Sequence, residues 1–103
     1  PEKKPKPVRL ITEGVTIQVL NGTAAAEAGE AMAEELTALG FQVVTVESTS
    51  KPYKETTVYW SFPDATKAAE ALAEKRDWIA DQKPANLADT VSLHVVVGND
   101  FLD

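Results

Sequence analysis

The sequence predicts an α+β domain, a two-layer sandwich in which two helices cover one sheet. Two observations support this prediction. Apolar runs with the alternation of β-strands lie near both ends of the chain, and two Ala-rich segments repeat apolar residues every three or four positions. The chain has 103 residues, 44% of them hydrophobic, which is enough for one domain with a single core and too little for two domains.

The first half of the chain predicts a strand, a helix and a second strand. Residues 15–20 alternate apolar and polar side chains, the period of a half-buried strand. Asn21-Gly22-Thr23 then turns the chain, and Thr23 or Asn21 is expected to cap a helix that begins within residues 24–26. Gly40 ends this helix, since glycine favours the position after a helix C-terminus. Its predicted inward stripe comprises Ala25, Ala28, Met32, Leu36 and Leu39.

The second half predicts two more strands around a second helix. Residues 41–46 form the second strand and residues 56–60 the third, separated by a polar loop. The second helix starts at Pro63-Asp64, with Asp64 as its cap, and continues to Lys83-Pro84. Residues 91–97 form the last strand, with alternate side chains on opposite faces. The predicted inward stripe of the second helix comprises Ala65, Ala68, Ala69, Leu72 and Ile79.

This order, strand–helix–strand–strand–helix–strand, commonly folds as a four-stranded, mainly antiparallel sheet with both helices on one face, the ferredoxin-like layout. The other face of such a sheet is open, and alternation assigns four side chains to it: Thr16, Gln18, Tyr59 and His94. The second strand is ambiguous because both of its faces are apolar. If Phe41 points inward, Val44 and Val46 join the open face, and a partly apolar open face indicates a docking surface.

Charge and composition limit the partners and the compartment. The first nine residues hold four basic residues and one acid, so the other 94 residues carry 6 basic and 15 acidic side chains, a net charge of −9. Such a surface repels phosphate backbones, which argues against nucleic acid as a partner. The absence of cysteine excludes disulfides but leaves the compartment open, and no run is long enough for a membrane span. Residues 1–13 are interpreted as a Pro/Lys-rich linker from an upstream membrane anchor, and residues 14–103 as the domain.

Catalytic and metal chemistry find little support in the sequence. His94 is the single histidine, and it is either a ligand contact or proton shuttle, or a half-exposed strand residue with a purely structural role. No cluster of His or Cys supplies a metal site, and no serine lies in a nucleophile-elbow pattern. We therefore expect that the chain is not an enzyme and that it binds no cofactor.

Polar residues at two predicted strand ends form a second candidate site. Asn21 follows the first strand and Asp100 follows the last, and the two lie at one rim if those strands run side by side in parallel. They either stabilise each other's turns or contact a sugar hydroxyl or a peptide. Asn21-Gly22-Thr23 before a helix could also hold an anion, but a lone glycine lacks the spacing of a phosphate-binding motif, and a cap-and-turn role is the favoured explanation.

Four segments together resemble the LytR C-terminal domain family: 19–23 (Val-Leu-Asn-Gly-Thr), 39–41 (Leu-Gly-Phe), 56–59 (Thr-Thr-Val-Tyr) and 96–100 (Val-Val-Gly-Asn-Asp). The resemblance implies a non-catalytic module on the extracytoplasmic face of the membrane or in the cell wall of actinobacteria. Because no catalytic domain is attached in this sequence, the chain resembles the stand-alone, membrane-anchored envelope proteins of the Cei/VirR type.

Two functions follow as hypotheses. The first is docking on envelope-assembly proteins such as LytR-CpsA-Psr ligases, favoured by the acidic charge, which repels anionic wall polymers. The second is glycan binding, to peptidoglycan or arabinogalactan, on an open sheet face. The candidate contact residues for either function are Gln18, Asn21, Tyr59, His94 and Asp100.

Overall fold

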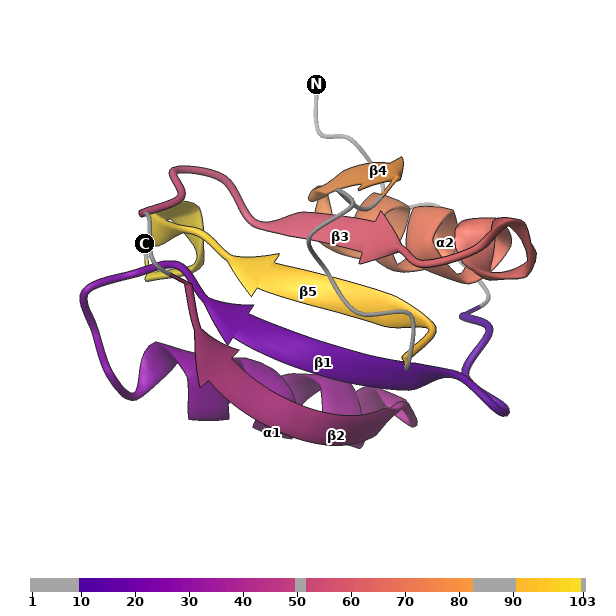
Figure 1. Cartoon of the computed structure of the whole chain (residues 1–103), viewed down its shortest axis with the longest axis horizontal. Helices are drawn as coiled ribbons and strands as arrows, with labels where there is room; N and C mark the ends of the chain where they lie inside the picture. The colour runs from indigo at the N-terminus through magenta and orange to yellow at the C-terminus, as the bar shows by residue number, and fades with distance from the viewer. Residues whose placement is uncertain (1–9, 50–51, 83–90, 103) are drawn as a thin grey trace, which may run out of the picture.

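The structure, a computed structural model, describes residues 10–49, 52–82 and 91–102. One five-stranded sheet forms the first layer, and two helices lie behind it in the view of Figure 1, one near each edge of the sheet. The elements are β1 (Thr16–Asn21), α1 (Ala28–Leu39), β2 (Gln42–Ser48), β3 (Thr57–Trp60), the 3₁₀ turn η1 (Pro63–Ala65), α2 (Thr66–Arg76), β4 (Ile79–Gln82), β5 (Leu93–Val97) and the 3₁₀ turn η2 (Asn99–Leu102).

The predicted α+β class with two helices on one face is confirmed, but the four-stranded, mainly antiparallel sheet is wrong. The strand order is β2-β1-β5-β3-β4, and three of the four strand pairs are parallel; only β3 and β5 are antiparallel. The reason is that each helix connects two adjacent parallel strands, giving the units β1-α1-β2 and β3-α2-β4. A ferredoxin-like sheet instead separates such strands by another strand. Here β5 lies between the two units and joins them.

The two units resemble each other in sequence as well as in layout. Residues 30–34 of α1 read Glu-Ala-Met-Ala-Glu, and residues 70–74 of α2 read Glu-Ala-Leu-Ala-Glu. Met32 and Leu72 occupy the same place in these runs, and both are 0% exposed. Each unit therefore presents the same kind of apolar stripe to the sheet.

Both helices end at a residue in the left-handed conformation. The sequence predicts this end for α1, where the residue is glycine, but not for α2. Gly40 takes φ 109° after α1 and donates its N–H to the carbonyls of Leu36 and Thr37, which confirms the predicted helix end. Asp77 takes the same role after α2, at φ 60°. The prediction of a helix up to residue 83 is therefore wrong, because the chain leaves the helix at Asp77 and forms β4.

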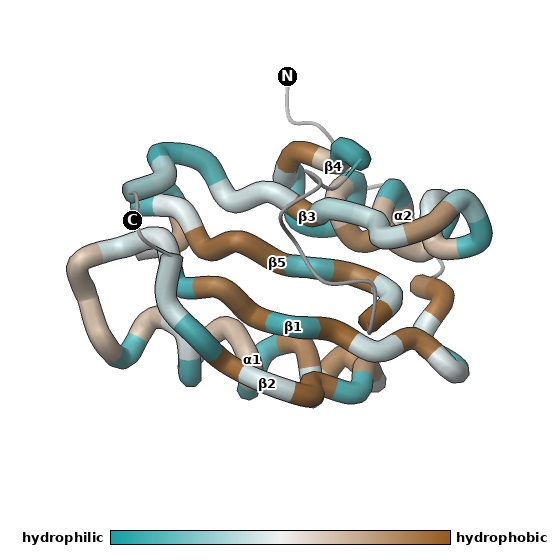
Figure 2. Tube along the Cα trace, viewed as in Figure 1, coloured by the Kyte–Doolittle hydropathy of each residue, from teal (hydrophilic) through white to brown (hydrophobic). Residues whose placement is uncertain are grey.

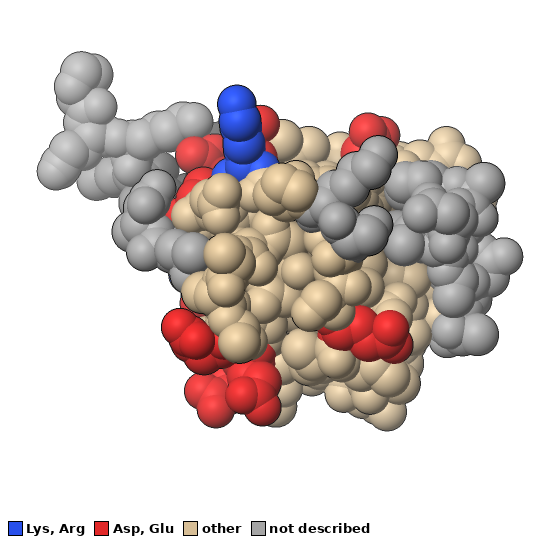
Figure 3. All heavy atoms as spheres, turned by 60° about the vertical axis from the view of Figure 1, so that its left-hand side comes forward, with Lys and Arg blue, Asp and Glu red and all other residues tan. Residues whose placement is uncertain are grey.

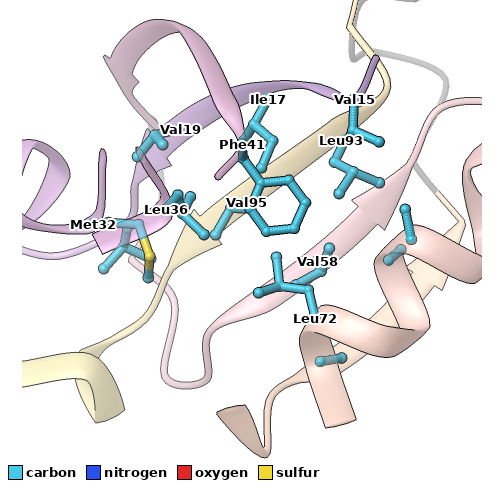
Figure 4. Close-up of a cluster of buried hydrophobic side chains, with 14 of the residues drawn as sticks. Val15, Ile17, Val19, Met32, Leu36, Phe41, Val58, Leu72, Leu93 and Val95 are labelled. Carbon is cyan, nitrogen blue, oxygen red and sulfur yellow. The ribbon is translucent and has the colours of Figure 1, made fainter. Parts of the chain in front are cut away.

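The core lies between the sheet and the helices. Ile17 and Val19 of β1, Val58 of β3, and Leu93 and Val95 of β5 point from the sheet into this layer, and all five are 0% exposed. Figure 4 shows them facing side chains from both helices, with Phe41 among them. Burial of each such side chain contributes roughly 1.5–3 kcal/mol. The helix side chains that complete the core include Met32, Leu36, Ala68, Ala69 and Leu72.

A β-bulge resolves the ambiguity of β2. Ile17 pairs with Val43, whereas Gln18 pairs with Thr45, so Val44 is an extra residue in β2. Before the bulge, Val43 packs on the core; after it, Val46 pairs with Val19 and returns to the helix side. The expectation that an inward Phe41 would place Val46 on the open face is therefore wrong, and Thr45 takes that face in its place.

Candidate functional site

A row of polar side chains crosses the open face of the sheet. His94 on the central strand pairs with Gln18 on one side and with Tyr59 on the other. Thr45 and Asp81 extend the row on β2 and β4. Because paired residues in a sheet point to the same face, these five side chains form one band, called here the polar row. Figure 2 shows its centre as hydrophilic segments midway along the otherwise hydrophobic β1 and β5.

The side chains of the polar row bond within the protein. Gln18 donates from Nε2 to Oε2 of Glu47 at 3.3 Å, and Asp81 accepts from the backbone N–H of Gln82 at 2.8 Å. Burial raises the pKa of Tyr59 above 10.0, and the charge of Tyr53 and its hydrogen bond to Tyr59 act in the same direction. Tyr59 is therefore a neutral phenol near pH 7, held by a second phenol.

The open face is less exposed than the sequence predicts. His94 is 0% exposed, and Val96, on the same face, is 1% exposed. The prediction of a solvent-facing His94 is wrong: its side chain is fully buried, with the paired residues Gln18 and Tyr59 beside it on the two neighbouring strands. Gln18 and Tyr59 are half-buried, and Thr16 is half-buried beside Ser92, whose Oγ lies 3.4 Å from the Thr16 hydroxyl.

Asn21 ends β1 and organises the turn that follows. Its side chain is buried, donates from Nδ2 to the carbonyl of Ala25 at 2.8 Å, and accepts from the N–H and hydroxyl of Thr23 at 2.9 and 2.7 Å. Neither Asn21 nor Thr23 caps α1, which begins later than predicted, at Ala28, after Glu27. Asn21 therefore stabilises its own turn, rather than sharing a turn with Asp100 as the structural alternative predicted.

Asp100 acts on a different segment. Residues 52–56, called here the strap, pass over the ends of β1 and β5 and bind both. The N–H of Tyr53 donates to Gly22, and the Tyr53 carbonyl accepts from Asn99. Oδ1 of Asp100 accepts from the N–H and the hydroxyl of Thr56, at 2.9 and 2.7 Å. Thr56 is 0% exposed, so this carboxylate satisfies a fully buried residue of the strap.

The strap leaves no room for side chains at the two glycines beneath it. A Cβ on Gly22 would lie 2.9 Å from Cδ1 of Tyr53 in the strap and 2.7 Å from the Val97 carbonyl oxygen in β5, and one on Gly98 would lie 2.6 Å from the backbone nitrogen of Thr56. Asn21 and Asp100 thus lie at the same rim because β1 and β5 run side by side in parallel, as the conditional prediction required. They stabilise different turns there.

Exposed apolar side chains lie on the sheet edges. Val44 and Val46 on β2 are 50% and 41% exposed, and Ile79 on β4 is 43% exposed. Figure 3 shows acidic side chains in separate groups around a broad uncharged area on the side of the molecule where β1, β2 and β5 end. Sequence reasoning missed the bulge that exposes Val44. It also missed the roles of Tyr53, which lies in the predicted polar loop, and of Thr56, which was predicted only as the start of the third strand.

Among residues 10–49, 52–82 and 91–102, no three His, Asp or Glu side chains converge as metal ligands would. Within the same ranges, neither helix has the length and hydropathy needed to cross a membrane.

Comparison with known proteins gives one family and two similar folds. The model of the family described as LytR cell envelope-related transcriptional attenuator matches residues 14–101. The soluble domain of a conserved hypothetical secreted protein from Mycobacterium marinum, the Rv2700 ortholog, is similar with a TM-score of 0.64 and 17% identity over 91% of this chain and 65% of that one. The C-terminal domain of Rv0431 is similar with a TM-score of 0.53 and 20% identity over 96% of this chain and 84% of that one.

At these identities the likeness concerns the fold. The chain spans about two thirds of the M. marinum domain, 65% of its length. No curated protein matches the sequence.

Proposed function

Since the chain belongs to the LytR cell envelope-related transcriptional attenuator family, we propose that it is a non-catalytic, extracytoplasmic domain that supports envelope integrity by docking on wall-assembly proteins such as LytR-CpsA-Psr ligases. The proposal places it among stand-alone envelope proteins of the Cei/VirR type. The family description supplies the process, and the distribution of exposed and buried side chains supports the mode of action.

One observation favours docking on proteins over binding glycans: the centre of the open sheet face is closed. A glycan platform needs an exposed aromatic ring and polar groups that are free to bond with sugar hydroxyls. His94 is 0% exposed, and Tyr59 is half-buried and hydrogen-bonded to Tyr53. Val44, Val46 and Ile79 are instead exposed on the two edge strands, and protein partners commonly bind at sheet edges.

The charge supports the same choice. Fifteen of the 16 acidic residues and 6 of the 10 basic ones follow residue 9, so residues 10–103 carry a net charge of −9. Anionic wall polymers are repelled by such a surface, whereas a protein partner with a basic patch is attracted.

The test compares two ligands with the same purified domain: the catalytic domain of a LytR-CpsA-Psr protein, followed by biolayer interferometry, and insoluble cell-wall sacculi, followed by cosedimentation. We expect saturable binding to the protein and no retention on sacculi. Gln18→Ala and Tyr59→Phe, which alter the polar row while keeping its packing, should leave both results unchanged. Retention on sacculi that either variant abolishes would overturn the proposal and establish glycan binding.

A further inference from the structure

We propose that the outer edge of β2 binds an extended, basic segment of the protein partner, which adds to the sheet as a further strand. This inference rests on the proposed function, because it names the surface and the chemistry of the partner that docks. Three observations carry it: the unprotected edge, the exposed valines on it, and the charge of the unit to which it belongs.

The β2 edge lacks most features that prevent strand addition. In the part of the chain that the structure describes, β2 has a hydrogen-bonded neighbour on one side only, which is β1. It is seven residues long and contains neither Lys nor Pro, the residues that commonly block an edge, although the bulge at Val44 makes its first part irregular. The opposite edge strand, β4, has only four residues. Of the two edges, β2 is the one open to a further strand.

The side chains of β2 divide between the two faces of the sheet. Val46 pairs with Val19 and lies beside Gly29 of α1, where a Cβ on the glycine would approach its Cγ1 to 2.9 Å. Glu47 pairs with Leu20 and lies on the open face, beside Gln18. A strand added to this edge would therefore meet valine on the helix side and a carboxylate on the open side.

The charge of the first unit defines the partner. Residues 10–50, which include β1, α1 and β2, contain six glutamates and no Lys, Arg or His, a net charge of −6. Glu47 is exposed on β2, and Glu30 is exposed in the first turn of α1. A second copy of this unit would place two such charges together, which disfavours self-association through β2. A segment that alternates apolar with Lys or Arg residues matches both faces, its apolar side chains against the valines and its cations toward Glu47.

The test uses the acetylated and amidated peptide Lys-Val-Lys-Val-Lys-Val-Lys as a probe, titrated into the ¹⁵N-labelled native domain and followed by NMR. We expect the largest amide shifts within residues 42–48, and an affinity that falls as sodium chloride is raised from 20 to 300 mM. The peptide Glu-Val-Glu-Val-Glu-Val-Glu should produce no shifts there. Val46→Lys should weaken binding of the basic peptide at least tenfold.

Ile79→Lys is the matched control, because Ile79 is 43% exposed on the other edge strand and Val46 is 41% exposed on β2. It should bind the basic peptide as the native domain does. Shifts centred on residues 79–82, equal loss in both variants, or no shifts at all would overturn the inference. So would a dimer in sedimentation equilibrium that Val46→Lys dissociates, since a second copy would then cover the edge.

The inference and the proposed function fail in different ways. If the domain binds the ligase catalytic domain and Val46→Lys binds it equally well, the proposed function stands and the β2 inference is overturned. If the basic peptide binds at β2 in the expected pattern but the ligase domain does not bind, the edge chemistry is supported and the proposed partner is wrong.

Discussion

Gly98→Ala tests how tightly the strap is held against the sheet. Gly98 follows β5 and lies directly beneath residues 55 and 56. A Cβ there would lie 2.6 Å from the nitrogen of Thr56 and 2.7 Å from the nitrogen of Glu55, with the Glu55 carbonyl carbon closer still. Ordinary contact begins at 3.4 Å, and all three atoms belong to the backbone, so no side chain can rotate away.

The loss of stability expected for Gly98→Ala can be estimated from the displacement of the strap. Overpacking of a well-packed site costs about 1–3 kcal/mol. Displacing the strap also strains the bonds that Thr56 makes to Asp100 and the bond that Gly98 donates to the Thr56 hydroxyl, each worth about 1 kcal/mol. We expect the free energy of unfolding to fall by about 3 kcal/mol, which lowers Tm by roughly 15 °C for a domain of this size.

Urea denaturation followed by circular dichroism measures this change, with Asn99→Ala as the control. Asn99 is the next residue, is exposed, and donates to the strap through its backbone N–H, which alanine retains. Asn99→Ala should stay within about 0.5 kcal/mol of the native domain. If Gly98→Ala also stays within that limit, the close contact between strap and sheet does not exist in solution, and the reasoning is refuted.

Three further predictions follow from the same contacts. Asp100→Ala should destabilise the domain by about 1–2 kcal/mol, because it removes the acceptor of a buried N–H, and a double-mutant cycle with Thr56→Val should give a coupling near 1 kcal/mol; additivity within 0.3 kcal/mol would show that the two side chains do not interact. Gly40→Ala should cost about 1–2 kcal/mol, since alanine must adopt φ 109°, and a Tm within 2 °C of the native value would contradict this. Because the pKa of Tyr59 is raised on folding, the unfolded chain ionises first, so the contribution of Tyr59 to stability should be constant below pH 10 and fall as pH rises above it; Tyr59→Phe should flatten that part of the urea–pH profile, and an unchanged profile would refute the assignment.

Local sequence patterns predicted β1, β5 and the end of α1, because each depends on residues close together in the sequence. The alternation of residues 15–20 and 91–97 gave β1 and β5, and Gly40 marked the end of α1 because glycine reaches a left-handed conformation without strain. β4 was missed because Asp77, a residue with no such signature, adopts that conformation at the end of α2. The Ala- and Glu-rich run before Asp77 does not indicate that α2 ends there.

The partners of each strand were not predictable from these patterns. The position of β5 between the two units follows from long-range pairing, which alternation within a strand does not encode. Alternation placed Gln18, Tyr59 and His94 on one face, and the register then brought them into adjacent positions. The burial of His94 depended on strand order and was therefore predicted wrongly. Val44 was ambiguous for a similar reason, since a bulge changes the face of every residue after it.

The position of β5 in the sheet also determines when the sheet can be completed during folding. β5 follows every other strand in the chain, yet the ladders β1-β2 and β3-β4 meet only through it, with Thr16 bonded to Ser92 across 76 positions of sequence. Contacts so distant in sequence slow folding, because the loop must close before they form. During synthesis or export, two half-sheets would wait with unpaired inner edges until residues 93–97 arrive. The risk of aggregation and proteolysis is thus highest before β5 has been synthesised and paired.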